Sequence, residues 1–487
     1  MPIFARLTLS LAVLCGCHPT SKDSVPTDSE PTADSAADTD ADTGSPQPCV
    51  VPDDPAAVFG EVLVEPSEAY PTVSTVRWTP TLEGESWVSF GRPSDAPWSA
   101  TAFDDDTGGK QATLLGMKAS TEYRYQVVVR TDDGTLCTEP TSLTTGALDP
   151  GLPSLTLDGD SPDLASGDFT LLPLCDQGGS GGCWTLILDG DADVVWAHPE
   201  GPLRAWLSLD GRAVLLNDHI YNPDHEGTIR RVPLDGGEAT ELSFLGAHTD
   251  FVEVEPGVYA TFGWDLREYQ GGARTIAGET IVEIAEDREP RVVWSTFDAL
   301  EPDLAQQHTT DPSWSTPAEI WAHLNHLHYA PDEDAYYATS RNQMAVYRID
   351  RATGETTWTL GQGGGDFQQT GEGQISFNPH SAIPTANGLL LFDTGSGTSG
   401  GCSGMSEFAL DDPPGAVEHT WLYTTEDCLV TNYMGNAIEL EGGNRMMVLA
   451  MNAQLHEVTP AGELAWRLQG PFGWLFGYVT RTASLYR

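Results

Sequence analysis

The chain has 487 residues, enough for two to four domains, and 72 acidic against 23 basic residues give it a formal net charge of −49. This charge excludes a general nucleic-acid-binding surface, which needs a basic face. A site for an anionic substrate would need local positive charge of its own. The 14 Trp and 14 Tyr residues are enough to supply a substantial core.

The first residues, MPIFARLTLSLAVLCGC, predict an export signal. Arg6 supplies one positive charge, and Leu7 to Leu14 form an apolar stretch too short to span a bilayer. The LCGC ending resembles a bacterial lipobox, in which Cys17 becomes the lipidated first residue; an ordinary cleaved signal peptide is the alternative. We expect residues 1–17 to be a lipoprotein-type signal. The protein would then be exported as a periplasmic or cell-surface lipoprotein that touches the membrane only through its lipid.

Residues 18–48 are rich in Ser, Thr, Asp, Pro and Ala, and Val25 is their only large apolar residue. Such a segment cannot bury enough surface to fold, so it predicts a disordered linker.

Six cysteines follow Cys17, and six cysteines allow 15 disulfide connectivities. Proximity in sequence favours Cys175–Cys183 and Cys402–Cys428, which leaves Cys49–Cys137 for the N-terminal domain. Disulfides fit an oxidising compartment. No CxxC spacing is present, so the cysteines do not predict a metal site.

Residues 49–148 alternate short strand-like runs with turns. Trp78 lies in one alternating run, and the segment LLGMKASTEYRYQVVVRTDDG carries Thr121, Tyr123, Tyr125 and Val127 at a period of two. This segment resembles the tyrosine-corner region of fibronectin type III domains. The resemblance implies a small β-sandwich that acts as a spacer or adhesion module, without catalysis.

Residues 152–487 repeat one shape: a strand, an acidic or glycine turn, and a strand that ends near a tryptophan. Five hairpins end at Trp196, Trp294, Trp358, Trp421 and Trp466, and GTIRRVPLDGGEATEL forms a sixth without the tryptophan. Six hairpins without helical periodicity predict an all-β fold with a six-bladed β-propeller, preceded by the sandwich. A large β-sandwich or a β-helix is the alternative.

Inner hairpins precede these outer ones, and four of them open with a polar residue: His248, His323, His380 and Asn436. Because the first strand of each blade lines the central channel, equivalent positions should converge at one end of it. In HLNHLHYAPDEDAYYATSR, two strands of similar length bring His323, Asn325 and Arg341 to the same rim. There the Arg341 guanidinium could bind a tetrahedral oxyanion.

The cluster His323, His326 and His328 also invites a metal-site interpretation. His326 and His328 share a strand parity that His323 does not, so the three cannot all line the channel in a regular strand. We expect His328 to serve packing and leave His326 open. A metal held by His248, His323 and His380 is conceivable, but Arg341 would be an unfavourable neighbour for a cation, and we predict no metal.

The segment HLNHLHYAPDEDAYYATSRNQMAVYRIDRATGETTWTLG resembles the most recognisable segment of the bacterial aryl-sulfate sulfotransferase family, and the resemblance extends from near His248 to Trp466. It implies a six-bladed propeller that transfers sulfuryl groups between phenols without a nucleotide donor. Carried over by position, it implies that His380 is the nucleophile, that His248, His323 and Arg341 are catalytic, and that Asn325 binds substrate. The chain has His380-Ser381 and His248-Thr249-Asp250 where the family tends to have HD and HHD.

The expected reaction moves a sulfuryl group from an aryl sulfate donor to a phenolic acceptor through sulfo-His380. Either His248 or His323 would exchange protons with the phenols, because the ordinary pKa of histidine, near 6.5, suits both directions. No cofactor is needed. If water replaced the phenol, the enzyme would be a sulfatase. The alternative is a non-enzymatic exported propeller that binds a ligand or a protein partner.

Overall fold

The computed structural model describes residues 49–486 except the following positions: 96–97, 101–108, 160–161, 179–180, 202, 219–221, 303, 306–307, 309–315, 317, 372–374, 376 and 396–399. The predicted export signal, the predicted lipidation site Cys17 and the predicted linker at 18–48 lie outside the described residues.

The N-terminal region forms two facing sheets after the short helix α1 (Pro55–Phe59), in the orders β1-β2-β5 and β4-β3-β6-β7 with β8 beside β6. Their strands are β1 (Leu63–Pro66), β2 (Ser74–Trp78), β3 (Glu85–Gly91), β4 (Ser99–Ala100), β5 (Lys110–Leu114), β6 (Glu122–Thr131), β7 (Gly134–Cys137) and β8 (Thr141–Thr144). Alternate residues of β2 and β3 are buried, and the two sheets share one apolar core. The Tyr123 hydroxyl accepts a hydrogen bond from the Lys118 N–H at 2.8 Å, as in a tyrosine corner. The fibronectin-type assignment stays a prediction.

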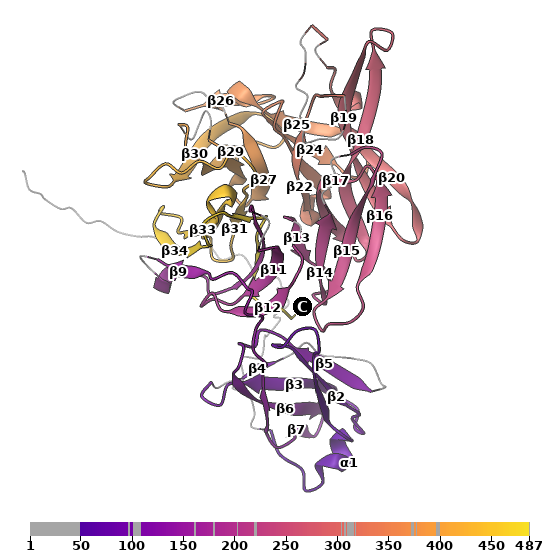
Figure 1. Ribbon diagram of the computed structural model, residues 1–487, viewed down its shortest axis with the longest axis vertical. Helices are drawn as coiled ribbons and strands as arrows, with labels where there is room; N and C mark the ends of the chain where they lie inside the picture. The colour runs from indigo at the N-terminus through magenta and orange to yellow at the C-terminus, as the bar shows by residue number, and fades with distance from the viewer. Residues whose placement is uncertain are drawn as a thin grey trace, which may run out of the picture. The chain divides into compact units, whose positions relative to one another are not determined.

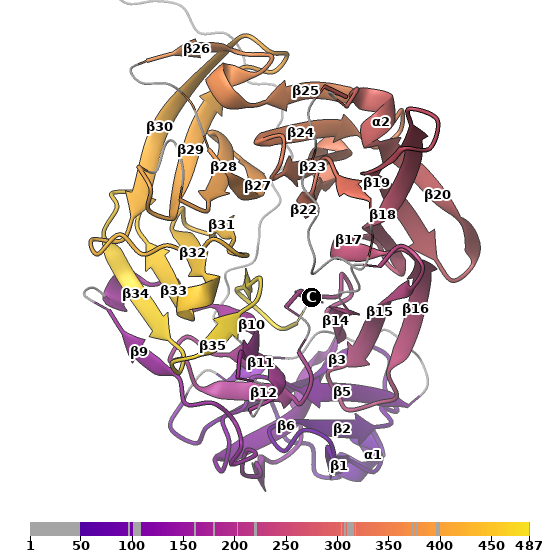
Figure 2. The same cartoon turned by 45° about the horizontal axis from the view of Figure 1, so that its top comes forward.

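The rest of the described chain forms six sheets, named I to VI here, that follow one another around a common centre (Figures 1 and 2). Their strands pair antiparallel except for the short edge strands β21 and β26, which pair parallel with their neighbours. Sheet I contains β10 (Phe169–Asp176), β11 (Cys183–Leu188), β12 (Val194–His198), β35 (Trp474–Phe476) and β36 (Thr480–Thr482). Sheet II contains β13 (Ala205–Leu207), β14 (Ala213–Asp218), β15 (Glu226–Pro233) and β16 (Thr240–Leu245). Sheet III contains β17 (His248–Glu255), β18 (Val258–Tyr269), β19 (Arg274–Ala285), β20 (Arg288–Ser295) and β21 (Glu319–Ile320).

Sheet IV contains β22 (Leu324–Ala330), β23 (Ala335–Ser340), β24 (Ala345–Asp350) and β25 (Thr356–Leu360). Sheet V contains β26 (Gln368–Thr370), β27 (Pro379–Thr385), β28 (Gly388–Asp393), β29 (Gly404–Leu410) and β30 (Ala416–Thr424). Sheet VI contains β31 (Ala437–Glu439), β32 (Arg445–Leu449), β33 (Gln454–Val458), β34 (Leu464–Gln469) and β9 (Thr156–Asp158). Short helical turns are α2 (Thr296–Ala299), η1 (Pro162–Leu164), η2 (Pro331–Glu333), η3 (Gln362–Gly364) and η5 (Ala450–Asn452).

The two ends of the propeller sequence meet in sheets I and VI. The C-terminal strands β35 and β36 pair with β10 in sheet I, and the early strand β9 pairs with β34 in sheet VI. These pairings close the ring, which leaves fewer unpaired sheet edges. The predicted all-β propeller is therefore confirmed.

Burial along the strands explains the sequence pattern. The second strands of the sheets, such as β14 and β23, are apolar and buried almost throughout, because neighbouring sheets cover both of their faces. The outermost strand β16 alternates between partly buried and exposed residues. Trp294, Trp358 and Trp466, which end three of the predicted outer hairpins, are at most 3% exposed and pack in the apolar clusters between sheets.

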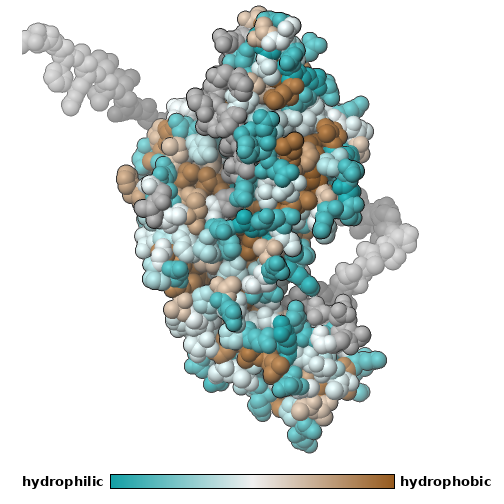
Figure 3. All heavy atoms as spheres, turned by 45° about the vertical axis from the view of Figure 1, so that its right-hand side comes forward, coloured by the Kyte–Doolittle hydropathy of each residue, from teal (hydrophilic) through white to brown (hydrophobic). Residues whose placement is uncertain are grey.

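Three disulfides join the cysteine pairs favoured by proximity: Cys49–Cys137, Cys175–Cys183 and Cys402–Cys428. They are typical of proteins in oxidising compartments such as the periplasm or the cell exterior. Within the described ranges, no helix has the length and apolar character needed to cross a membrane. Figure 3 shows a face that is largely hydrophilic with separate apolar patches, in keeping with the acidic composition.

Candidate active site

The three predicted histidines lie at the same end of the inner strands of sheets III, IV and V. His248 is the first residue of β17, His323 directly precedes β22, and His380 is the second residue of β27. The charge of His323 contributes to lowering the pKa of both His248 and His380, although burial is the larger cause for each. The structure therefore brings the three histidines into one electrostatic neighbourhood.

Local irregularities of the backbone aim these side chains. The pairing register shifts between His248 and Phe251 in β17, between Leu324 and His326 in β22, and between Pro379 and Ser381 in β27. His323 has a φ of 55°, in the left-handed region. Bulges are common beside active sites because they redirect a side chain without breaking the sheet. Three inner strands thus begin with the same kind of irregularity.

His380 is held through both ring nitrogens. Its Nδ1 lies 2.6 Å from the Tyr478 hydroxyl, and its Nε2 accepts a hydrogen bond from the Met434 N–H at 3.1 Å. Because Nε2 accepts, the ring proton of the neutral imidazole is on Nδ1, where it donates to Tyr478. Burial first, and then the charge of Arg204, lowers the pKa of His380 well below its usual value. The ring is therefore neutral with its lone pair on Nε2.

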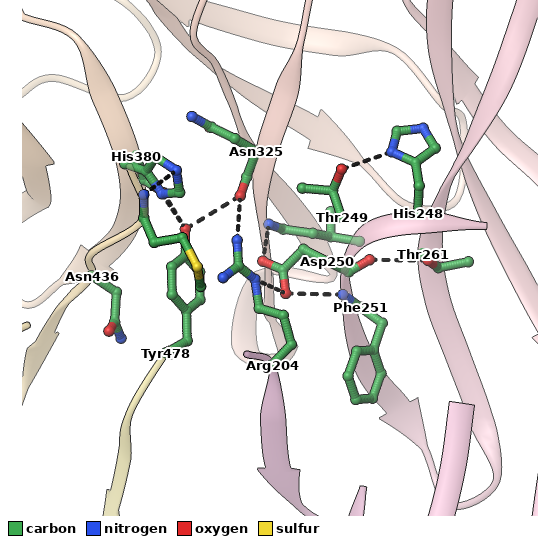
Figure 4. A network of polar contacts seen from close by, with 12 residues as sticks. Arg204, His248, Thr249, Asp250, Phe251, Thr261, Asn325, His380, Asn436 and Tyr478 are labelled. Atoms are coloured by element: carbon green, nitrogen blue, oxygen red, sulfur yellow. Dashed lines mark hydrogen bonds and ion pairs between the residues drawn. The ribbon is translucent and has the colours of Figure 1, made fainter. Parts of the chain in front are cut away.

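Tyr478 and Arg204 form a part of the site that we did not predict from the sequence (Figure 4). The Tyr478 hydroxyl can donate to the carbonyl oxygens of His380 at 2.5 Å and Asn325 at 3.2 Å. The Arg204 guanidinium carbon lies 3.3 Å from the centre of the Tyr478 ring. Arg204 is 2% exposed and Tyr478 is fully buried, so this cation lies inside the channel.

Asp250 balances the charge of Arg204. Its Oδ1 lies 3.3 Å from Arg204 Nε and accepts from the Phe251 N–H, and its Oδ2 accepts from the Leu327 N–H at 2.9 Å. Burial raises the pKa of Asp250 to about 6, against the opposing effect of Arg204. Arg204 Nη2 also donates to the Asn325 carbonyl at 3.2 Å. The ion pair thus joins sheets II, III and IV.

Asn325, predicted to bind substrate, has its side-chain amide engaged with neighbouring sheets. Its Nδ2 donates to the Pro379 carbonyl at 3.1 Å, and its Oδ1 accepts from the Thr339 hydroxyl at 2.5 Å. The amide therefore connects sheet IV to the residue directly before His380.

His248 is fully buried. Its Nδ1 lies 2.7 Å from the Thr249 hydroxyl, and its ring centre lies 4.3 Å from that of Trp264. Burial lowers its pKa to about 3, so it is neutral at physiological pH.

Arg341 lies beside His323, at the rim that the hairpin predicts. Its N–H donates to the His323 carbonyl at 3.0 Å, and its charge contributes to lowering the pKa of His380. Arg341 is exposed and His323 is partly exposed. The site therefore has two cations: Arg341 at the surface and Arg204 within the channel.

Glu279 supports the backbone at His323 from sheet III. Its Oε1 accepts from the Leu324 N–H at 3.0 Å, and its side chain is fully buried. Burial raises the pKa of Glu279 to about 8. This carboxyl group is another component that the sequence did not indicate.

The parity argument for the histidine cluster needs a correction. It assumed a regular strand, but the bulge between Leu324 and His326 changes the parity at that point. His326 and His328 both line a cavity of about 470 Å³ farther along the channel. We expected His328 to serve packing, but it also lines this cavity.

A signal for Arg204 was present in the sequence. The segment RAWLSLDGRAVLL has the same order of polar residue, strand, turn and strand as the aligned inner hairpins, and Arg204 occupies its opening position. Tyr478 has no such signal, because it lies two residues after the closing strand β35, which pairs with the much earlier strand β10.

One group of three acidic side chains in the described part of the chain is close enough to hold a metal ion: Asp189, Asp191 and Asp193. The Lys118 ammonium lies among them, at 3.2, 2.7 and 2.6 Å from their carboxylates. This cluster therefore has a cation of its own and does not indicate a metal site.

A neutral imidazole with a fixed tautomer, two further histidines and the Arg341 guanidinium can act together on an anionic ester: the imidazole as nucleophile, and the cation as a ligand for the ester oxygens.

Comparisons with known proteins assign the chain to a family. A search of curated proteins found no match. Similar solved structures include a putative 6-phosphogluconolactonase from Bacteroides uniformis, at 11% identity and a TM-score of 0.37, covering 65% of this chain and 100% of that chain. Virginiamycin B lyase from Staphylococcus aureus has 12% identity and a TM-score of 0.26, covering 65% of this chain and 99% of that chain. Neither likeness is close enough to bear on function. The family model "Arylsulfotransferase (ASST)" matches residues 186–465, more than half of the chain, and the chain therefore belongs to the arylsulfotransferase family.

Proposed function

We propose that this protein transfers a sulfuryl group from an aryl sulfate ester to a phenolic acceptor through a sulfohistidine at His380, without a nucleotide sulfate donor. One observation carries the proposal: His380 is neutral, keeps its proton on Nδ1 against Tyr478, and has its lone pair on Nε2. Family membership supports a transferase that acts on aryl sulfates and phenols.

In the first half-reaction, His380 Nε2 attacks the sulfur of the donor, an N–S bond forms, and the S–O bond to the aryl group breaks. The attack requires that the Met434 N–H, which now donates to Nε2 at 3.1 Å, give up that contact. The freed amide can then donate to a sulfonate oxygen, as backbone amides in oxyanion holes do.

The departing phenolate takes a proton, and we assign this step to His323. His248 is fully buried with a pKa of about 3, so it is poorly suited to hold a proton near neutral pH. His323 is partly exposed and lies beside His380. In the second half-reaction His323 removes the proton of the incoming phenol, whose oxygen attacks sulfur and releases His380 Nε2.

The two cations have separate tasks. Arg341 at the rim binds the incoming sulfate, and its charge offsets the acidic surface. Arg204, neutralised by Asp250, stabilises the phenolic group of Tyr478 by stacking and so fixes the His380 ring. Asn325 positions the strand that carries His380 through the Pro379 carbonyl, and its second amide proton is available to a sulfonate oxygen.

The N-terminal segments place the enzyme outside the cytoplasm in this proposal. Residues 1–17 direct export, Cys17 carries the lipid, residues 18–48 act as a tether, and the domain at 49–148 acts as a fibronectin-like spacer before the catalytic domain at 152–487.

The test is an assay with 4-nitrophenyl sulfate, with and without phenol, on the full-length protein and His380→Asn. We expect release of nitrophenol that depends on phenol, formation of phenyl sulfate, and loss of both in the variant. His225→Asn, the same change at an exposed histidine, serves as the control. Release without acceptor would indicate a sulfatase, and an active His380→Asn protein would refute the covalent route.

A further inference from the structure

The inner strands line a cavity beyond the histidine end, called the chamber here. This chamber has a volume of about 470 Å³ and is lined by inner strands of five of the six sheets. Its lining includes Trp206, His326, His328, Ile383, Ile438 and Thr480. A cavity of this size lies in the range of small-molecule sites.

The chamber is distinct from the catalytic end because Tyr478 and Arg204 lie between them. The His326 ring centre is 5.5 Å from that of Tyr478 on the chamber side, whereas the Tyr478 hydroxyl contacts His380. Arg204 stacks on the same tyrosine ring. These buried side chains form the layer that separates the two compartments.

Three nitrogen atoms of the chamber residues are buried and have no hydrogen-bond partner among the described residues: Trp206 Nε1, His326 Nδ1 and Arg481 Nε. The His326 side chain is 2% exposed, and that of Arg481 is also 2% exposed. Buried polar groups in folded proteins are nearly always paired. All three nitrogens belong to residues that line the cavity, which favours a ligand that offers acceptor oxygens.

The charges of the chamber argue against an anion. Glu439, Glu441 and Asp168 line it, and the Arg481 guanidinium is already paired with Glu457 at 2.9 Å. Burial raises the pKa of Glu439, which nevertheless remains an acceptor in either protonation state. A sulfate ester would meet carboxylates here without an unpaired cation.

The remaining walls are aromatic and aliphatic: Trp206, Ile383, Ile438 and Leu440. A planar ring can pack on them, a hydroxyl oxygen can accept from the N–H groups, and the hydroxyl proton can be donated to a carboxylate. An uncharged phenol offers all three features.

We propose that the chamber is a second binding site, specific for an uncharged phenol and closed to its sulfate ester. The choice of ligand class rests on the proposed function, in which phenols are acceptor and product. The site itself is defined by the chamber residues and needs no step of the transfer reaction.

Binding of 4-bromophenol to the full-length protein, measured by equilibrium dialysis, tests the proposal. Ile438→Trp fills the chamber, and Leu245→Trp adds the same side chain at an exposed position of β16. We expect Ile438→Trp to bind one 4-bromophenol fewer per chain than wild type, and Leu245→Trp to bind as many as wild type. Phenyl sulfate in excess should leave the chamber phenol in place.

Two further measurements test the chamber site even if Ile438→Trp does not fold. Trp206→Phe keeps a ring but removes Nε1–H, and should weaken binding about fivefold, the effect of one hydrogen bond. In crystals of the wild-type protein soaked with 4-bromophenol, the anomalous bromine peak should lie against Ile438.

A chamber without bromine, or full binding by a folded Ile438→Trp protein, overturns the proposal. If Ile438→Trp binds one phenol fewer but the wild-type protein shows no sulfuryl transfer, the proposed function is refuted and the chamber site is supported.

Discussion

The two ends of the inner strands differ in backbone regularity and in hydrogen bonding. At the histidine end, β17, β22 and β27 begin with register shifts, and His380, Asn325 and Asp250 have partners from neighbouring sheets. Farther along β22 and β27 the pairing is regular, although β17 has a second register shift. The chamber residues Trp206 and Arg481 have nitrogen atoms without a hydrogen-bond partner among the described residues.

This difference separates two ways of building a site in one channel. Side chains that act on a covalent bond must be fixed within a fraction of an ångström, and cross-sheet hydrogen bonds provide that order. A binding chamber needs only shape and unpaired polar groups. Substitutions at the histidine end should therefore change activity or stability in the way that the contacts of each residue indicate.

The largest expected effect is on proton transfer. His323→Asn should lower kcat/KM for phenyl sulfate by about 10²–10⁴-fold, the usual contribution of a general acid. The loss with 4-nitrophenyl sulfate should be much smaller, because nitrophenolate leaves without a proton. His225→Asn, at an exposed histidine, is the control. Equal losses for the two donors would rule out this role for His323.

The second largest effect is expected on stability, when the buried cation Arg204 is removed. Arg204→Met leaves Asp250 buried without its partner and should lower the free energy of unfolding by about 3 kcal/mol near pH 8. The loss should shrink toward pH 5, because Asp250, with a pKa of about 6 even beside Arg204, then takes up a proton. Urea unfolding at both pH values measures this.

Arg130→Met provides the matched control for Arg204→Met, because Arg130 pairs with Glu85 on the surface and both side chains are about half exposed. Exposed pairs contribute about 0–1 kcal/mol. If the two arginine variants lost the same stability at both pH values, the buried pair would have no special role.

A smaller effect is expected from the tyrosine that fixes the His380 tautomer. Tyr478→Phe keeps the ring under Arg204 but removes the hydroxyl that lies 2.6 Å from His380 Nδ1. It should lower kcat by about tenfold, the effect of one hydrogen bond to a group that becomes charged, while KM changes little. An increase in KM with unchanged kcat would place Tyr478 in substrate binding instead.

The smallest effect concerns Glu279. Its pKa is about 8 in the folded protein against 4.5 for an unperturbed glutamate, so folding takes up a proton between these pH values. The contribution of Glu279 to stability therefore falls as pH rises through that window. Glu279→Gln keeps an acceptor for the Leu324 N–H but does not titrate. Its melting temperature relative to wild type should increase from pH 5 to pH 8, and a constant difference would contradict this.

The features that could be predicted from the sequence are those that repeat along the chain and those that join nearby residues. The tryptophan-ended hairpins indicated the propeller, equivalent positions identified His248, His323 and His380, and proximity identified the disulfides. Strand parity failed at His326 because a bulge inserts a residue where no periodic pattern marks it.

The missed residues have different physical reasons. Arg204 held an equivalent position, but its hairpin lacked the histidine that drew attention to the others. Tyr478 reaches His380 only because the C-terminal strands close the ring against β10, a long-range pairing without a sequence signature. The carboxyl groups of Asp250 and Glu279 acquire their raised pKa values from burial, which only the packed structure defines.

We propose that sulfur bonds to His380 Nε2 during turnover. Rapid acid-free quenching of the full-length protein with 4-nitrophenyl sulfate and no acceptor, followed by peptide mass spectrometry, tests it directly. We expect that the mass of one SO₃ group is added to the peptide that contains His380, and that phenol removes it at the rate of turnover. Modification of a different residue, or nitrophenol release coupled to phenol without any modified His380, would refute the covalent route through His380.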